Sequence, residues 1–167
     1  MANFKGHIVG GIVAGSSVGL ANYAVQVGHL PDGGTLLNDW QLLAGVLVLS
    51  VMFGLWPDVD TNSKAQDAFF GLAFVADIAL IIGKQYPAAA FLGLLAMTPI
   101  LGTHRGWTHK KLTMLLIPSP ILIIPYLVTN HVGDTAILLY VAAVAGYFSH
   151  LLLDGLIFKW FRIKGGW

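Results

Sequence analysis

The stretch TAILLYVAAVAGYFSHLLLDGLIF, residues 135–158, decides the fold of this chain. It is long enough to cross the hydrocarbon core of a bilayer, which takes about 20 apolar residues. Its only histidine and its only acidic residue are His150 and Asp154, both near its carboxyl end. This pattern is typical of a transmembrane helix, and ionisable groups inside such a helix usually have a function.

The rest of the chain has the same character. Of its 167 residues, 56% are hydrophobic and only 10% are charged, and the mean hydropathy is +0.75. A soluble domain carries about 25% charged residues. The composition therefore predicts one integral-membrane helical domain over residues 1–167, with membrane lipids as its partners. The net charge of +1 comes from scattered residues and indicates no nucleic-acid partner.

Five further apolar runs precede the stretch at 135–158. They cover about residues 8–27, 41–56, 68–83, 87–102 and 112–129. The expected fold class is an all-α polytopic transmembrane bundle of about six spans. The second, third and fourth runs are shorter than about 20 residues, so four spans with two re-entrant segments is the alternative.

Prolines and glycines predict how these helices bend and pack. The fifth run contains Pro118, Pro120 and Pro125. They predict a kinked helix whose freed carbonyl groups must find partners within the bundle. The first run contains Gly10, Gly11, Gly15 and Gly19. Small residues of this kind allow neighbouring helices to approach closely.

The basic residues predict the orientation. With six spans, eight of the nine lysines and arginines fall on one side, and only Lys84 falls on the other. Cytoplasmic loops carry such an excess of basic residues, so both termini are expected in the cytoplasm.

Residues able to bind a metal gather at span ends on this same side. They are His7, Asp58, Asp60, His104, His109, His150 and Asp154. The chain has neither cysteine nor glutamate, so a metal would have only nitrogen, aspartate and other oxygen ligands. Imidazoles favour zinc, while the carboxylates keep manganese or iron as alternatives.

The segment GTHRGWTHKK at 102–111 is the densest of these. Its two glycines favour a bent loop or helix entry, in which His104 and His109 converge or serve two metals. Arg105 between them suits a phosphate or carboxylate, because guanidinium binds such oxygens through two parallel hydrogen bonds. The alternative is an ordinary basic loop that only sets topology.

Two shorter motifs complete the set. In WPDVD, Pro57 ends the second helix and places Asp58 and Asp60 in the following turn. The alternative is a simple turn or helix cap. In HLLLD, His150 and Asp154 are four residues apart and share one helix face. Here the alternative is a buried His–Asp pair that joins helices.

Asp77 stands apart from these residues. It lies about nine residues into the third run, near the middle of the bilayer, too deep to join the cytoplasmic residues. It is expected to hydrogen-bond polar groups on neighbouring helices or to belong to a proton path.

The order of His7, PDVD, HRGWTH and HLLLD resembles the YdjM-like inner-membrane proteins, over about residues 4–158. This bacterial family is described as LexA-regulated, metal-dependent hydrolases. The chain departs from the pattern at Thr61, where a histidine is expected, and at Lys110, in place of a small polar residue. HLLLD is also similar to the helical His-x-x-x-Asp of zinc-dependent phospholipase C and of single-strand nucleases.

The resemblance implies a multi-pass hydrolase of the bacterial inner membrane. The position of the site just below the cytoplasmic surface favours an amphiphilic substrate with a polar head, such as a phospholipid or lipid-linked phosphate. The expected metal ligands are His104, His109, His150 and one of the aspartates 58, 60 or 154, with His7 as a further ligand. A remaining aspartate, Asp58 first, would be the general base, and Arg105 would neutralise developing charge. The alternatives are a transporter or metal-ion carrier and a non-catalytic membrane protein.

Overall fold

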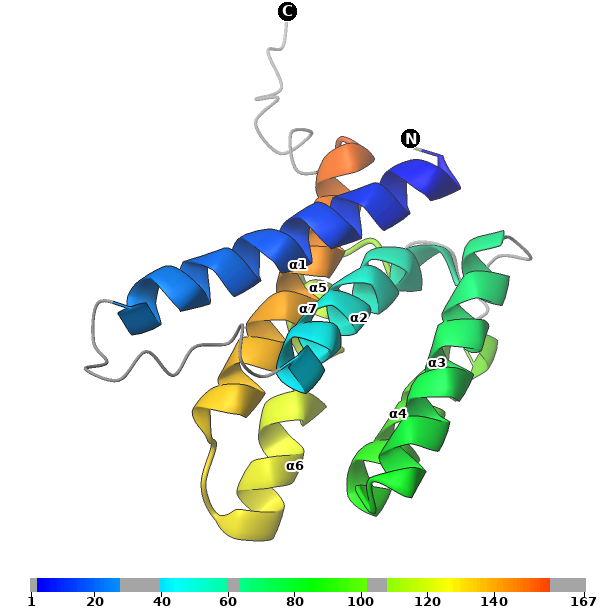
Figure 1. Cartoon of the computed structure of the whole chain (residues 1–167). Helices are drawn as coiled ribbons and strands as arrows, with labels where there is room; N and C mark the ends of the chain where they lie inside the picture. Colours follow the sequence, from blue (N-terminus) through cyan, green and yellow to red (C-terminus); the bar gives the residue numbers. More distant parts are fainter. Residues whose placement is uncertain (1–2, 28–39, 60–63, 102–107, 157–167) are drawn as a thin grey trace, which may run out of the picture.

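Figure 1 shows the computed structural model, which describes residues 3–27, 40–59, 64–101 and 108–156. Every regular element in these ranges is helical, as predicted. The elements are α1 (Phe4–Val27), α2 (Trp40–Leu55), the 3₁₀ turn η2 (Trp56–Asp58), α3 (Lys64–Ile82), α4 (Tyr86–Leu101), α5 (Lys111–Leu116), α6 (Pro120–Thr129) and α7 (Asp134–Leu153).

Five helical stretches are long and apolar enough to cross a membrane. They are Phe4–Val25, Trp40–Asp58, Lys64–Ile82, Lys111–Thr129 and Asp134–Leu153. The fourth predicted run, at residues 87–102, forms α4, whose described apolar part is shorter. The described part of the chain thus confirms a polytopic helical bundle. Five stretches of spanning length are one more than the alternative with four spans requires.

The fifth segment is broken, as its prolines predict. α5 ends at Leu116 and α6 begins at Pro120. The Ser119 hydroxyl donates to the Leu116 carbonyl at 2.7 Å, and the Tyr140 hydroxyl donates to the Leu115 carbonyl at 3.2 Å. Side chains therefore bind carbonyl groups that the break in the helix leaves exposed.

The last span ends earlier than residue 158, and this part of the prediction was wrong. Gly155 adopts a left-handed backbone conformation with φ of 70°. Its N–H donates to the Leu152 carbonyl at 2.9 Å, and the Leu156 N–H donates to the Leu151 carbonyl at 3.0 Å. A glycine in this conformation terminates a helix. Asp154 therefore lies at the end of α7 rather than inside it.

Helices α1, α2 and α7 meet where their backbones touch. We call Gly11, Ser50, Gly54 and Gly146 the three-helix junction. A methyl group on Gly146 would lie 2.0 Å from the Ser50 carbonyl oxygen. The Ser50 hydroxyl donates to the Gly11 carbonyl at 2.8 Å. The close packing expected of the glycines in α1 is confirmed here, and their partners are small residues on α2 and α7.

The core continues from this junction toward the α3–α4 hairpin. Trp56, Phe53 and Tyr147 are almost fully buried, and Phe69 of α3 belongs to the same apolar cluster. In Figure 1, α3 and α4 run side by side as a hairpin next to α2, while α1 crosses the bundle at a steep angle to them. Many apolar side chains are exposed elsewhere, as expected of surfaces that face lipid.

Candidate metal centre

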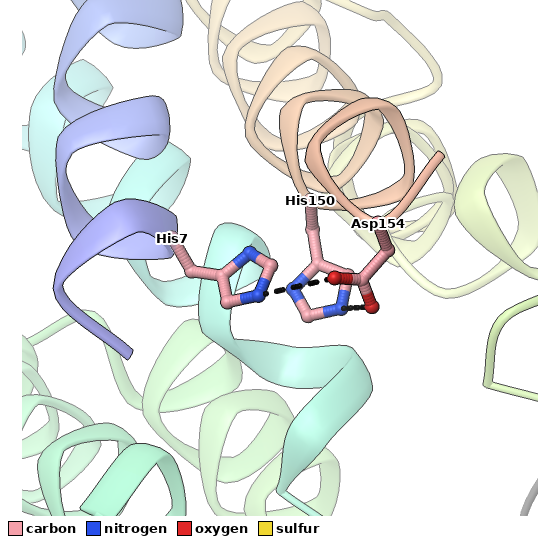
Figure 2. A group of neighbouring side chains, drawn as sticks. All are labelled: His7, His150 and Asp154. Carbon is pink, nitrogen blue, oxygen red and sulfur yellow. Dashed lines mark ion pairs between the residues drawn. The ribbon is translucent and has the colours of Figure 1, made fainter. Parts of the chain in front are cut away.

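Four separate segments bring ionisable side chains together at one end of the bundle. His7 comes from the first turns of α1, and Asp58 from the 3₁₀ turn after α2. His109 lies two residues before the start of α5, while His150 and Asp154 come from the end of α7. We call these five residues the His/Asp cluster. Figure 2 shows His7 facing His150 and Asp154 across the gap between α1 and α7.

The Nε2 atoms of the three imidazoles all face the same two carboxylates. His7 Nε2 lies 3.5 Å from an Asp154 oxygen and 3.8 Å from an Asp58 oxygen. His150 Nε2 lies 3.6 Å from Asp154 and 3.7 Å from Asp58. For His109 Nε2 the corresponding distances are 3.9 Å and 3.7 Å. The five side chains thus enclose one small space.

The separations between the imidazole nitrogens and the carboxylate oxygens are close to those of ligand atoms that share a metal ion. With metal–ligand bonds of about 2.0–2.1 Å at tetrahedral angles, ligand atoms lie about 3.3–3.4 Å apart. The observed distances of 3.5–3.9 Å are longer than that value by between about 0.1 and 0.6 Å, so a small inward movement of the side chains would bring them to it. Two overlapping groups, His7–His150–Asp154 and Asp58–His109–His150, have the donors and spacing to hold a metal ion.

The imidazole rings are oriented by groups behind them. The Nδ1 atom of His150 is 2.8 Å from the Gly54 carbonyl oxygen, to which it donates. Because that nitrogen carries the proton, neutral His150 presents the Nε2 lone pair to the cluster. His109 Nδ1 lies 3.0 Å from the Thr108 hydroxyl, and the Tyr147 hydroxyl donates to the Thr108 carbonyl. Tyr147 and Thr108 therefore position His109.

Ring stacking gives an independent indication of charge. The rings of His7 and His150 are stacked, with centroids 3.9 Å apart and planes 17° apart. Two imidazolium cations at this separation would repel each other. The stacking is therefore better satisfied by neutral rings, which is the form that binds metals.

Burial makes a cation at this place favourable. His150 and His7 have exposed side-chain fractions of 0% and 2%, and Asp154 has 2%. His150 Nε2 makes no hydrogen bond with any residue that the structure describes. Two carboxylates brought together at low exposure need a compensating positive charge. Asp58 is 32% exposed and is thus the carboxylate that water reaches most easily.

The structure describes some of the predicted site residues and not others. It brings together the five members of the His/Asp cluster. Asp60, His104 and Arg105 lie outside the described residues, so their roles stay predictions. Sequence reasoning missed Thr108, Tyr147 and the Gly54 carbonyl. Thr108 was within reach, because it precedes His109 inside HRGWTH, but a backbone carbonyl leaves no signal in a sequence.

Asp77 lies away from the cluster, as expected. It faces a cavity of about 390 Å³ between α3 and α4 that is lined mainly by apolar residues. Its Oδ1 atom is buried and finds no hydrogen-bond partner among the described residues. The hydrogen bond expected of this oxygen to a neighbouring helix is therefore not seen in the described part of the chain.

The comparison with protein families supports the prediction that the chain is a membrane protein. The model of the family described as YdjM inner membrane protein matches residues 1–159. The chain belongs to the YdjM family. All five members of the His/Asp cluster lie within the matched YdjM residues. No curated protein and no solved structure matches the chain.

Proposed function

We propose that this YdjM protein is a metal-dependent hydrolase whose active site is the His/Asp cluster. One observation carries the proposal. Three imidazole nitrogens face two carboxylates at distances of 3.5–3.9 Å, and the five side chains come from four separate chain segments. Zinc is the metal that this donor set suits first, because imidazole supplies most of the donors. Manganese and iron also accept such a mixture.

The burial of each residue suggests its role. His7, His109, His150 and Asp154 would hold one or two metal ions, since their donor atoms lie within the enclosed part of the cluster. Asp58 is the most exposed member, so its carboxylate can accept a proton from water on the substrate side. Arg105 would neutralise charge on a phosphate or acyl oxygen.

A bound divalent ion would activate water near neutral pH and polarise the bond to be broken. The protein contributes the fixed orientation of the rings through the Gly54 carbonyl and Thr108. The cluster lies where helices end, and the distribution of basic residues predicts that this end faces the cytoplasm. This position favours an amphiphile whose polar head reaches the site, such as a phospholipid or a lipid-linked phosphate.

Metal analysis combined with an activity assay tests the proposal. Protein purified gently in detergent is expected to hold stoichiometric metal and to release phosphate or headgroup from phospholipid micelles. Chelation should abolish turnover, and readdition of the metal should restore it. Asp58→Asn is expected to retain metal but lose turnover. His131→Ala, an exposed histidine outside the cluster, is the matched control.

Two outcomes would reject the proposal. Wild-type protein without stoichiometric metal would remove its basis. Stoichiometric metal without turnover, together with metal flux across proteoliposomes, would favour a metal-ion carrier instead.

A further inference from the structure

A groove of about 890 Å³ runs between α1 and α7 and opens to the outside of the bundle. Among the lining residues that the structure describes, three have polar side chains, namely Lys5, Ser17 and Ser149. The Ser17 hydroxyl donates to the Val13 carbonyl at 2.8 Å, and the Ser149 hydroxyl donates to the Gly146 carbonyl at 2.7 Å. Because the helices' own backbones satisfy both hydroxyls, the groove offers an apolar ligand an almost entirely apolar surface.

The groove exists because small residues recur on one face of α1. They are Gly6, Gly10, Ala14, Ser17 and Ala21, three or four residues apart. At Gly10 the two helices are in contact, since an added methyl group would lie 2.7 Å from Leu153 Cδ1 and 3.2 Å from Ser149 Oγ. The regular spacing of these small residues along α1 thus accounts for a groove that follows the helix.

The groove has the length of a lipid tail. From Lys5 to Ala21, α1 rises about 24 Å at 1.5 Å per residue. One leaflet of the hydrocarbon core is about 15 Å thick, half of the roughly 30 Å total. A complete acyl chain therefore fits along the groove.

One end of the groove adjoins the His/Asp cluster. Lys5 and Gly6 line it immediately before His7, and Leu153 lines it immediately before Asp154. His7 and Asp154 face each other at 3.5 Å across the same pair of helices, as Figure 2 shows. A ligand whose tail lies in the groove would place its head beside the cluster.

Lys5 sets the charge expected of that head. Its side chain is exposed and is the only charged one among the described residues that line the groove. A lysine acts as a point charge for phosphate. Apolar walls along the whole length and one cation at the cluster end complement an anionic phospholipid.

We infer that the groove between α1 and α7 binds an acyl chain of a phosphate-bearing lipid and presents the phosphate to the His/Asp cluster past Lys5. This inference rests on the proposed function for its substrate, but the binding site itself can be tested without turnover.

The first experiment measures binding directly. Full-length protein in phosphatidylcholine vesicles is irradiated with a phosphatidic acid that carries a photoactivatable group in its acyl chain. Labelled peptides are expected from both α1 and α7. Ser17→Phe, which fills the groove, should lose most of the labelling. Ser16→Phe, on the exposed surface of α1 beside it, should keep it.

A second variant tests whether Lys5 recognises the phosphate of the lipid headgroup. Lys5→Gln should reduce labelling by phosphatidic acid several-fold and leave labelling by a photoactivatable diacylglycerol unchanged. This arm remains informative if Ser17→Phe fails to fold. Equal labelling of the two phenylalanine variants, equal labelling by both lipids in the wild type, or crosslinks between two protein chains through the groove would each overturn the inference.

Metal content and turnover separate this inference from the proposed function. Ser17→Phe should keep its metal and still cleave a short-chain, water-soluble phosphate ester, while it loses activity on long-chain lipid. Labelling of the groove without turnover of any substrate would reject the hydrolase and leave the lipid site standing. If Ser17→Phe cleaves long-chain lipid at the wild-type rate, the groove is not the acyl-chain site, whereas the proposed hydrolase function is unaffected.

Discussion

Asp154 and Asp77 are both carboxylates of membrane-embedded helices, yet their surroundings differ. Asp154 lies beside the three-helix junction, where three imidazoles and a second carboxylate face it. Asp77 lies on α3 and faces an apolar cavity, and its Oδ1 has no hydrogen-bond partner in the described part of the chain. Convergence of groups from distant segments, rather than the presence of an acid, therefore distinguishes a site.

The packing of the two regions differs in the same way. At the three-helix junction, a methyl group added to Gly11 or Gly146 would lie 2.8 Å or 2.0 Å from the backbone of α2. In the hairpin, Gly71 and Gly93 have open space around them. The tightly packed region holds the His/Asp cluster, because groups fixed to within tenths of an ångström are what metal coordination needs.

The largest effect is expected from His150→Ala. This side chain is fully buried and its Nε2 faces both carboxylates, so its loss should abolish metal retention and turnover. Metal content of the purified variant, measured by mass spectrometry beside His131→Ala, checks this. Stoichiometric metal in His150→Ala would remove the cluster from the mechanism.

Gly146→Ala should destabilise the protein. The added methyl group would lie 2.0 Å from the Ser50 carbonyl oxygen, and backbone on both sides resists movement. Overpacking of this kind costs about 1–3 kcal/mol. Gly71→Ala is the matched control in the hairpin, and should be neutral or stabilising by up to about 1 kcal/mol. Unfolding in detergent measures both, and equal stabilities would refute the contrast in packing.

Thr108→Val should weaken metal binding while the fold persists. It removes the hydroxyl that lies 3.0 Å from His109 Nδ1 and keeps a similar shape. Loss of a group that orients a metal ligand costs about 10–100-fold in affinity. Titration with a competing chelator gives the affinity, and Thr129→Val, at an exposed helix end, serves as control. Unchanged affinity would mean that the hydroxyl does not position His109.

The smallest effect is expected from Asp77→Asn. The change replaces the carboxyl group by an amide at nearly constant shape, away from the His/Asp cluster, so metal content and turnover should match the wild type. The same two assays measure it. A large loss of turnover with retained metal would instead connect Asp77 to the cluster, as a proton path requires.

Much of the fold follows from local features of the sequence. Apolar runs predicted the six helical segments, and Pro118 and Pro120 predicted the break between α5 and α6. The end of α7 was missed, because Gly155 terminates the helix within a run that remains apolar. Hydropathy depends on side-chain composition, so it does not reveal where a single residue with a left-handed backbone conformation ends a helix.

The site was predictable only in outline. Side-chain type and span order brought His7, Asp58, His109, His150 and Asp154 onto one side of the membrane. Their mutual distances depend on contacts between helices, such as Ser50 with Gly11. The glycines of α1 indicated close packing, but the role of Gly54 and Gly146 depends on which helix packs against each of them. Contacts between helices cannot be predicted from the sequence of one helix alone.

The spacing of the junction and the cluster fixes a rotational register. Gly11 lies four residues after His7, and Gly146 lies four residues before His150, so in each helix both residues share one face. Inserting one residue between such a pair would turn the histidine by about 100° and direct it toward lipid or another helix. The helix would remain as hydrophobic as before. Insertions that membrane integration tolerates would therefore still disable the centre, whereas substitutions that preserve length and apolarity on the lipid face would not.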